Sequence, residues 1–482
     1  MHKKSFILVF TLFIAHQSFA QQVWNLESVV RYAMVNNIGV KLSEIQAKNA
    51  ALTHGQSKLA LYPNANLNIS PGISSGNNQD PTTFSRVTQT FLNTGLQFQT
   101  SADLFNWYSK RNQILSNEWE LKAATANVGK VAYDIALAAA NAYLQILLAL
   151  EQQKITGIQI EQTSAQLANT QKLVDAGSLP YLNLTQLEAQ LALDSSNYIT
   201  AKGNVSQSLL NLKGFLSIDA SENFEVETPP VSSIPLEPIA ELQPEDVYDL
   251  ALSNQPLQQF NDLKLKAASY ATAAAKGRLY PTISMFGGLS TNYLAFQKRP
   301  IFSQTINGFS NTPLQVDVNG TNYTVKQPIF VPGARLGFIR PDAVFTQFSD
   351  NFRQNLGLNI SIPIFNGGAA KTNHKRSQLN EEGLQMQKRQ DNLKLKQDIY
   401  AAYTAAVIAL EKFNASKKTV TSSQATLDFA KKRFDVGVLG SFDLITTQNN
   451  LLRAKLEYTI NEFDYIFKMK VLEFYRGQGL KL

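Results

Sequence analysis

The side chains that most often carry enzyme chemistry are scarce in this chain. It has 482 residues, no cysteine and four histidines, and only His54 and His374 lie beyond the first twenty residues. The lack of cysteine excludes disulfides, thiolate metal sites and thiol nucleophiles together. A metal centre or a histidine-based triad needs several such groups in one place, and the sequence has neither a phosphate-binding glycine loop nor a dinucleotide fingerprint. We therefore predict no enzyme, with no catalytic residue, no metal site and no cofactor.

The basic charge of the chain is spread along its length. Lysine and arginine exceed aspartate and glutamate by 7, and by 5 once Lys3 and Lys4 are set aside. Nucleic-acid binding requires basic side chains gathered into a patch or stripe. These side chains are scattered, as on a solvated surface, so we predict no nucleic-acid partner.

The first twenty residues have the pattern of an export signal. His2, Lys3 and Lys4 form a charged start, residues 6–15 an apolar core, and residues 18–20 a small-x-small cleavage site. We interpret residues 1–20 as a signal peptide, because the apolar core is too short to cross a bilayer as a helix.

No later segment offers eighteen consecutive apolar residues. The nearest is 135–150, which Asn141 and Gln145 interrupt, and it is typical of a packed helix. If the mature chain enters a membrane, it must do so with strands.

The elements that remain are written twice. Residues 101–215 reappear as 361–475 at a constant spacing of 260, and residues upstream match at a spacing of 218, which leaves 42 additional residues in the second copy. A duplication of this length indicates one pseudo-symmetric body rather than two or three independent domains. The longer match includes Ser101 and Ser361, Phe105 and Phe365, Asn106 and Asn366, Tyr143 and Tyr403, Gly177 and Gly437, and Leu179 and Leu439.

Each copy predicts one very long helix and two shorter ones. Residues 105–175 and 365–435 lack proline and have helical spacing of apolar positions, so each predicts a helix of about 65–70 residues, roughly 100 Å long. Glycines at 177 and 437 suit left-handed helix ends, Pro180 suits a first helical turn, and Ser441 suits an N-cap. Helices at 181–215 and 442–475 follow, and helices at 26–59 and 244–277 precede. Two short helices stacked end to end have about the length of one long helix.

Between the first helix and the long helix of each copy, apolar residues alternate with amides and small polar residues. Hairpins are predicted at about 64–104 and 282–364, with one apolar and one amide-rich face, which suits either a soluble sheet or a water-filled membrane barrel. Four strands cannot close, and open edges are not tolerated in lipid. A membrane barrel would therefore be shared, with eight strands from two chains or twelve from three.

We therefore divide the chain into the signal peptide 1–20, a first repeat 21–216, a proline-rich connector 217–242 and a second repeat 243–482. The additional residues are expected to extend the second hairpin over about 297–347 as a long extracellular loop, since barrel proteins carry their long loops outside the cell. That segment contains Pro300, Pro313, Pro328, Pro332 and Pro341.

In this order and twice over, the motifs resemble those of the TolC-type outer-membrane efflux proteins. The resemblance covers essentially all of the mature chain. It rests on Leu104-Phe105-Asn106 and Ile364-Phe365-Asn366 where strand passes into helix, on Gly177 and Gly437 at the helical turns, and on the run from Gly437 to Asp443-Leu444-Ile445.

The resemblance implies an α+β membrane protein. Duplicated antiparallel helices would form a periplasmic α-barrel, and four strands per chain would contribute to a trimeric twelve-stranded transmembrane β-barrel in the outer membrane. It also implies a homotrimer that works with a periplasmic adaptor and an inner-membrane transporter, without a cofactor and without covalent chemistry.

The resemblance also places a gate. Asp443 falls on a carboxylate position that lines the periplasmic constriction in the family, and Thr446 occupies a second position that is acidic in the best-known member. Leu439 and Phe434 replace an arginine and a tyrosine that latch the closed state there, and Asn183 replaces an aspartate. The general gate is expected to carry over without the detailed latch. As an alternative, Asp443 is simply an acidic residue in a first helical turn.

We further expect the two helical turns to dock the adaptor, because both consist of small residues at the far end of the helices. The residues of these tips are Gly177, Ser178, Leu179, Pro180, Gly437, Val438, Gly440 and Ser441.

The expected function is passive export of small molecules through the outer membrane as the duct of a tripartite pump. Two alternatives stay open, namely the duct of a type I polypeptide secretion system and a structural envelope protein without a channel.

Overall fold

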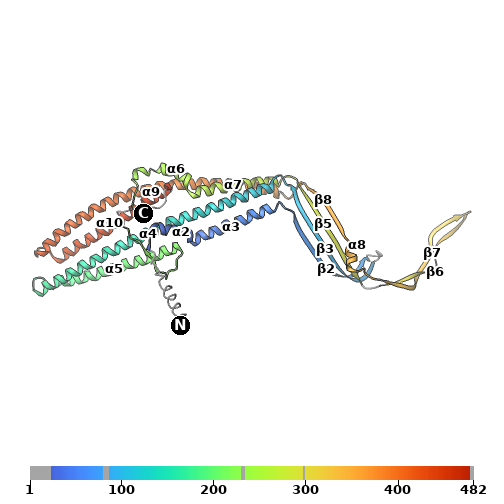
Figure 1. Ribbon diagram of the computed structural model, residues 1–482, viewed down its shortest axis with the longest axis horizontal. Coiled ribbons are helices and arrows are strands. Elements are labelled where there is room, and N and C mark those ends of the chain that lie inside the picture. The colour runs from blue at the N-terminus through green and yellow to red at the C-terminus, as the bar shows by residue number, and fades with distance from the viewer. Residues whose placement is uncertain (1–22, 80–85, 230–233, 297–298, 478–482) are drawn as a thin grey trace, which may run out of the picture. The chain divides into compact units, whose positions relative to one another are not determined.

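The structure, a computed structural model, describes residues 23–79, 86–229, 234–296 and 299–477, so the predicted signal peptide 1–20 lies outside it. The chain forms two compact units (Figure 1). Among the described residues, the helical unit holds 23–55, 112–229, 234–272 and 374–477, and the strand unit holds 56–79, 86–111, 273–296 and 299–373. Each unit combines segments of both sequence repeats, so the physical division of the chain is between helices and strands.

The two long helices have the predicted lengths. Helix α4 spans Ser109–Asp175 and helix α9 spans Ala369–Asp435, with 67 residues each. Both begin four residues later than predicted, because the preceding residues have left-handed backbone. Trp107 and Tyr108 have φ of 48° and 58°, and Gly367 and Gly368, at the same repeat positions, have φ of 65° and 76°. A right-handed helix cannot include such residues.

The short helices after the turns also match the prediction, with α5 at Tyr181–Leu216 and α10 at Ser441–Arg476. The helices that precede the hairpins differ, because each is broken once. Helices α2 (Leu26–Asn36) and α3 (Ile38–Leu59) flank Asn37, and helices α6 (Pro244–Asn254) and α7 (Pro256–Gly277) flank Gln255. The prediction of continuous helices over 26–59 and 244–277 was wrong.

The physical reason for the break differs between the copies. In the second copy Pro256 lacks an N–H and disfavours helical backbone at the residue before it. In the first copy the side chain of Asn37 replaces the helical bonds, since its Oδ1 accepts from Gly39 N at 2.7 Å and its Nδ2 donates to Phe215 O at 2.8 Å.

These breaks are where two short helices meet end to end. The end of α5 meets the first break through the bond from Asn37 to Phe215 and through Ile38 N, which donates to Ser217 Oγ at 3.2 Å. In the second copy Gln255 Nε2 donates to the carbonyl of Tyr475, near the end of α10, at 3.4 Å. The helical unit therefore has the end-to-end stacking that the helix lengths predicted.

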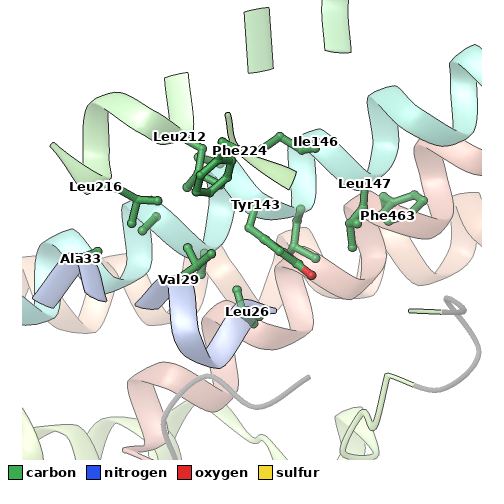
Figure 2. Close-up of a cluster of buried hydrophobic side chains, with 14 residues drawn as sticks. Leu26, Val29, Ala33, Tyr143, Ile146, Leu147, Leu212, Leu216, Phe224 and Phe463 are labelled. Carbon is green, nitrogen blue, oxygen red and sulfur yellow. The ribbon is translucent and has the colours of Figure 1, made fainter. Parts of the chain in front are cut away.

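A hydrophobic cluster lies at the first of these joins. Side chains of α2, α4, α5 and α10 pack around Tyr143, which is fully buried (Figure 2). Helix α4 contains a stretch apolar and long enough to cross a membrane, but half of it is buried, and Ala139–Leu147 supply much of this cluster. The stretch is accordingly explained as protein core. A second cluster around Ile399, Met469 and Leu472 occupies the corresponding join of the second copy.

The connector is fixed to the ends of the short helices. Strands β1 (Val23–Trp24) and β4 (Glu225–Val226) pair in parallel, and the 3-10 turn η2 spans Ile239–Glu241. Lys470 Nζ lies 2.6 Å from Pro235 O and 2.7 Å from Glu473 Oε2. This buried lysine is thus paired with a carboxylate and hydrogen-bonded to the connector, as a buried charge requires.

The strand unit contains one four-stranded antiparallel sheet in the order β2-β3-β5-β8. Its strands are β2 (Asn64–Gln79), β3 (Arg86–Phe105), β5 (Thr282–Phe296) and β8 (Arg353–Ser361). The hairpins of the two repeats join through the pairing of β3 with β5. Strands β2 and β8 are therefore the edges of the sheet.

The additional residues of the second copy differ from the predicted loop. Most of them form a second hairpin of β6 (Arg299–Val318) and β7 (Thr321–Ile339), followed by helix α8 (Val344–Asp350). Prolines fit here because both strands of a two-stranded hairpin have a free edge, and Pro328 and Pro332 lie in β7 beside shifts of register. Pro363, which lacks an N–H, explains why β8 ends at Ser361, earlier than predicted.

Candidate functional site

One face of the four-stranded sheet is lined by amide and small side chains. Paired residues lie on the same face of a sheet, so Asn66 shares a face with its partner Gln99, as does Gln97 with Ser290. The residues of this face line a concavity of about 650 Å³. Of the residues that line the concavity, those that belong to this face are Asn64, Asn66, Gln97, Gln99, Ser101, Phe286, Gly288, Ser290, Arg353 and Asn355.

The opposite face of the same sheet is apolar and uncovered. Leu67 and Ile69 of β2 are 62% and 59% exposed, and Leu356 and Leu358 of β8 are 77% and 64% exposed. A soluble sheet covers its apolar face, and a continuous exposed apolar surface marks contact with lipid or with another protein. The polarity of the two faces is the reverse of a water-soluble packing, and it is the arrangement of a barrel wall around water.

The two helical tips have the same backbone geometry. At the end of α4 the N–H of Ser178 bonds to Leu173 O at 2.8 Å and the N–H of Gly177 bonds to Val174 O at 2.9 Å. At the end of α9 Val438 bonds to Arg433 O and Gly437 to Phe434 O, both at 2.9 Å. Gly177 and Gly437 have φ of 73° and 74°, which completes the glycine-terminated helix end that the sequence predicted.

Two of the predicted helix starts are shifted by one residue. Pro180 is the N-cap of α5 and lies outside its first turn, and Gly440 is the N-cap of α10, so Ser441 is the first helical residue. The hydroxyl oxygen of Ser441 is buried and lies 2.7 Å from Gln186 Oε1 and 2.9 Å from Asn183 Oδ1, so its single proton is shared between these two acceptors. Ser441 therefore joins α10 to α5, whereas the remaining tip residues are exposed or half-buried.

The predicted gate residues divide into two groups. Asp443 and Thr446 lie exposed in the first turns of α10, and Asp443 has no ion-pair partner within the described ranges. Phe434 and Leu439 pack against a small hydrophobic cluster that includes Leu427 and Leu444. Two of the positions that the resemblance assigns to a polar latch, Phe434 and Leu439, thus have apolar contacts here, and the third, Asn183, has a polar contact with Ser441.

Sequence reasoning missed a buried polar seam between α4, α5 and α10. The carboxylate of Asp194 is 1% exposed and accepts from Thr163 Oγ1 at 2.6 Å and from Gln190 Nε2 at 2.7 Å. Gln190 and Asn449 also exchange two hydrogen bonds of 3.1 Å. The corresponding position in the second copy is Ala454, so the duplication gave no signal for this carboxylate.

A titratable pair lies on α10. Burial raises the pKa of the Tyr458 hydroxyl to about 12 and raises the pKa of the Glu462 carboxyl, while the Tyr458 hydroxyl donates to Glu462 Oε1 at 3.0 Å. Over the described part of the chain, no cluster of three or more histidine and acidic side chains could hold a metal ion.

Comparison with known proteins gives the same picture. A sequence model described as "Outer membrane efflux protein" matches residues 30–216 and 247–462. The outer membrane protein TolC of Escherichia coli (strain K12) is 22% identical over 479 residues, which cover 96% of this chain and 84% of TolC. The outer membrane efflux protein BepC of Brucella suis is 24% identical over 164 residues, 33% of this chain and 36% of BepC.

Solved structures share the fold at low identity. CusC, whose crystal structures concern folding and transmembrane channel formation, has a TM-score of 0.73 at 17% identity and covers 94% of this chain and 92% of its own. The CmeC outer membrane channel of Campylobacter jejuni has a TM-score of 0.70 at 18% identity and covers 95% of this chain and 86% of its own.

Proposed function

The chain belongs to the outer membrane efflux protein family, and from this membership we propose that three copies associate into one export duct. The protein is an outer-membrane protein with a periplasmic helical part. Each copy contributes its four strands to a twelve-stranded barrel and its helices to a periplasmic tunnel. Solutes are handed to the duct by a periplasmic adaptor and an inner-membrane transporter, which supply the energy.

The open edges of the sheet support a shared barrel. Strand β2 pairs only with β3, and β8 pairs only with β5, over the strands that the structure describes. Backbone N–H and C=O groups left unpaired in lipid cost several kcal/mol each. Pairing β2 of one copy with β8 of the next satisfies both edges, and repeating this step three times closes the ring with the amide face inward.

The opposite polarity of the two faces of the sheet is the observation that carries this proposal. An amide-lined interior holds water, and the exposed leucines and isoleucines of the outer face contact lipid chains. Two copies would give only eight strands, whose interior is filled by side chains. Twelve strands leave room for solutes, and this favours the trimer.

Disulfide crosslinking tests the assembly without background, because the chain has no cysteine. A cysteine at Asn66 on β2 is combined in turn with a cysteine at each position of β8, 353–361. For one register we expect crosslinked dimers and trimers, and nothing larger, on a denaturing gel. We also expect the purified protein to show single-channel conductance in planar bilayers. Material that runs as a monomer and conducts no ions would overturn the proposal.

We place the docking of the adaptor at the two tips. Ser178 is exposed, and Val438 is 66% exposed, so cysteines at these positions are expected to crosslink to a cognate adaptor. Ser441 is 1% exposed and provides the matched control, which should not crosslink. If thiol reagents in solution label all three cysteines and none of them crosslinks to the adaptor, the tips are not the docking site.

Small molecules are the cargo we propose, as in efflux, and a type I polypeptide secretion duct is the second candidate. A deletion strain that becomes sensitive to toxic compounds supports the first, and loss of one secreted polypeptide supports the second. A structural envelope protein would show neither phenotype and no conductance.

A further inference from the structure

The amide-rich face of the sheet carries very little charge. Pairing of the strands assigns every residue of β2, β3, β5 and β8 to one face or the other. Over the described strands, only Asp103 and Arg353 are charged on the amide-rich face. The Asp103 carboxylate lies 2.8 Å from Lys110 Nζ, so this negative charge is neutralised locally.

Arg353 has no such partner. It is the first residue of β8, is paired with Ser290 of β5, and its side chain is exposed. Asp350, three residues earlier at the end of α8, forms no ion pair with it, and within the described ranges no other carboxylate does so. The guanidinium is positive at every physiological pH, so the face keeps one uncompensated positive charge per chain.

Glycines on the neighbouring strands leave the sheet face around Arg353 without tall side chains. A side chain at Gly288 would meet Asn355 Oδ1 at 2.5 Å, and one at Gly357 would meet the Phe286 ring at 2.6 Å. The side chains of Asn355 and Phe286 therefore lie flat across the glycines of the neighbouring strands. The face between them stays shallow, and the guanidinium of Arg353 stands beside the concavity that these residues line.

We propose that Arg353 makes the strand part of the duct select for anionic solutes. This inference rests on the proposed trimer, in which three copies of Arg353 form one ring at the same level of the barrel. Amide side chains solvate either sign of charge, so a ring of three guanidinium groups decides the sign of the field there. Anionic solutes that leave the helical tunnel would be drawn into this level and held beside the amides.

Reversal potentials in planar bilayers test the proposal, with a tenfold gradient of KCl across wild-type protein and two variants. Arg353→Gln is expected to lower the chloride-to-potassium permeability ratio by about twofold, and Arg353→Glu to lower it further, because the sign of the ring is inverted. Arg340→Gln removes the same charge outside the four-stranded sheet, from an exposed residue between β7 and α8, and should leave the ratio unchanged.

The outcomes separate this inference from the proposed function. If wild-type and Arg353→Glu channels conduct with the same reversal potential, the anion-selective ring is excluded while the duct stands. If Arg340→Gln shifts the ratio as much as Arg353→Gln, the effect belongs to net charge and the ring is again excluded. Absence of any conductance in the wild type, by contrast, overturns the duct itself.

Discussion

The two repeats reach the same backbone geometry with different residues. Where strand passes into long helix, the first repeat has Trp107 and Tyr108 and the second has Gly367 and Gly368, all with left-handed backbone. Glycine adopts this conformation freely, whereas other residues are destabilised by about 1–2 kcal/mol each. The architecture thus requires the turn, and the first repeat forms it in spite of its side chains.

Aromatic contacts offset this strain in the first repeat. The ring of Trp107 lies 4.9 Å from that of Tyr280 and 5.3 Å from that of Phe105, and Tyr108 lies 6.0 Å from Phe105. Such contacts contribute about 0.5–1.5 kcal/mol each, which is comparable to the strain. Copies of one ancestral segment have therefore diverged where side-chain contacts could replace conformational freedom.

The largest expected loss of stability comes from placing a buried carboxylate in the second repeat, at the position that corresponds to Asp194 of the first. Ala454 is 4% exposed in α10, and Ala454→Asp would bury a charge without partners, a destabilisation of about 3–5 kcal/mol. The reciprocal change Asp194→Ala loses two hydrogen bonds and should cost about 1–3 kcal/mol. Denaturant unfolding followed by circular dichroism measures both, and equal losses would show that the two sites are equivalent after all.

The second test replaces the glycines of the second repeat. The double change Gly367→Ala and Gly368→Ala should destabilise the protein by about 2–4 kcal/mol, because both residues have positive φ. Gly383→Ala is the matched control, since Gly383 lies inside α9 with open space around it and should stabilise the helix by about 1 kcal/mol. A double variant as stable as wild type would mean that the turn is not required.

At Trp107 the glycine variant should be more stable than the alanine variant, which is the reverse of the usual order of stability. Trp107→Ala loses the ring contacts and keeps the strain, whereas Trp107→Gly loses the contacts and releases the strain. We expect the alanine variant to be the less stable of the two by about 1 kcal/mol, measured as the difference in thermal midpoint. Elsewhere alanine is the more stable residue, so the usual order at this position would refute the strain.

A smaller, pH-dependent effect is expected at Glu462, which corresponds to the exposed Lys202 of the first repeat. Burial raises the pKa of this carboxyl, more than the hydrogen bond from Tyr458 lowers it, and Glu151 raises it further while Lys417 opposes. A raised folded pKa means that the stabilisation is present below the unfolded pKa and is lost as pH rises through the folded pKa. Glu462→Gln should therefore match wild type near about pH 4 and be more stable near about pH 7.5. A constant difference at both pH values would assign the effect to packing.

The last test concerns ion selectivity, and its effect on stability should be the smallest. Asp443 corresponds to Asn183 of the first repeat. Asp443→Ala removes a carboxylate from the first turn of α10 and should change stability by less than about 1 kcal/mol. If three copies line the periplasmic constriction, Asp443→Ala should lower the preference for cations in planar bilayers, because a negative charge is lost. Asn183→Asp adds a negative charge and should raise that preference. Unchanged selectivity in both would take these positions out of the pore.

The sequence predicted features that follow from local periodicity and failed where tertiary contacts decide. The sequence correctly predicted the lengths of α4 and α9, the helix ends at Gly177 and Gly437, and the alternating faces of β2 and β3. The break at Asn37 was not predicted, because it depends on a bond to Phe215, far away in the chain. The break at Gln255, by contrast, has a local signal, because Pro256 disfavours helical backbone at the residue before it.

The site was predictable to a similar extent. The helical turns that carry the tips and the first turn that carries Asp443 were predicted from the sequence, and their roles in docking and in a gate stay predictions. The buried Asp194, the inward hydroxyl of Ser441 and the unpaired Arg353 could not be predicted, because each depends on which residues face it across an interface. The additional residues were expected to form a long loop over about 297–347, and most of them pair as β6 and β7.

The order of strands in the sheet has a consequence for biogenesis. Phe91 pairs with Phe296, so the first hairpin must wait until some two hundred further residues have been translocated before its neighbour arrives. During that interval its leucines and isoleucines face the aqueous periplasm, in a nascent chain with high contact order. The four-stranded sheet can therefore form only after both hairpins are present, and until then the edge of β3 that pairs with β5 stays open.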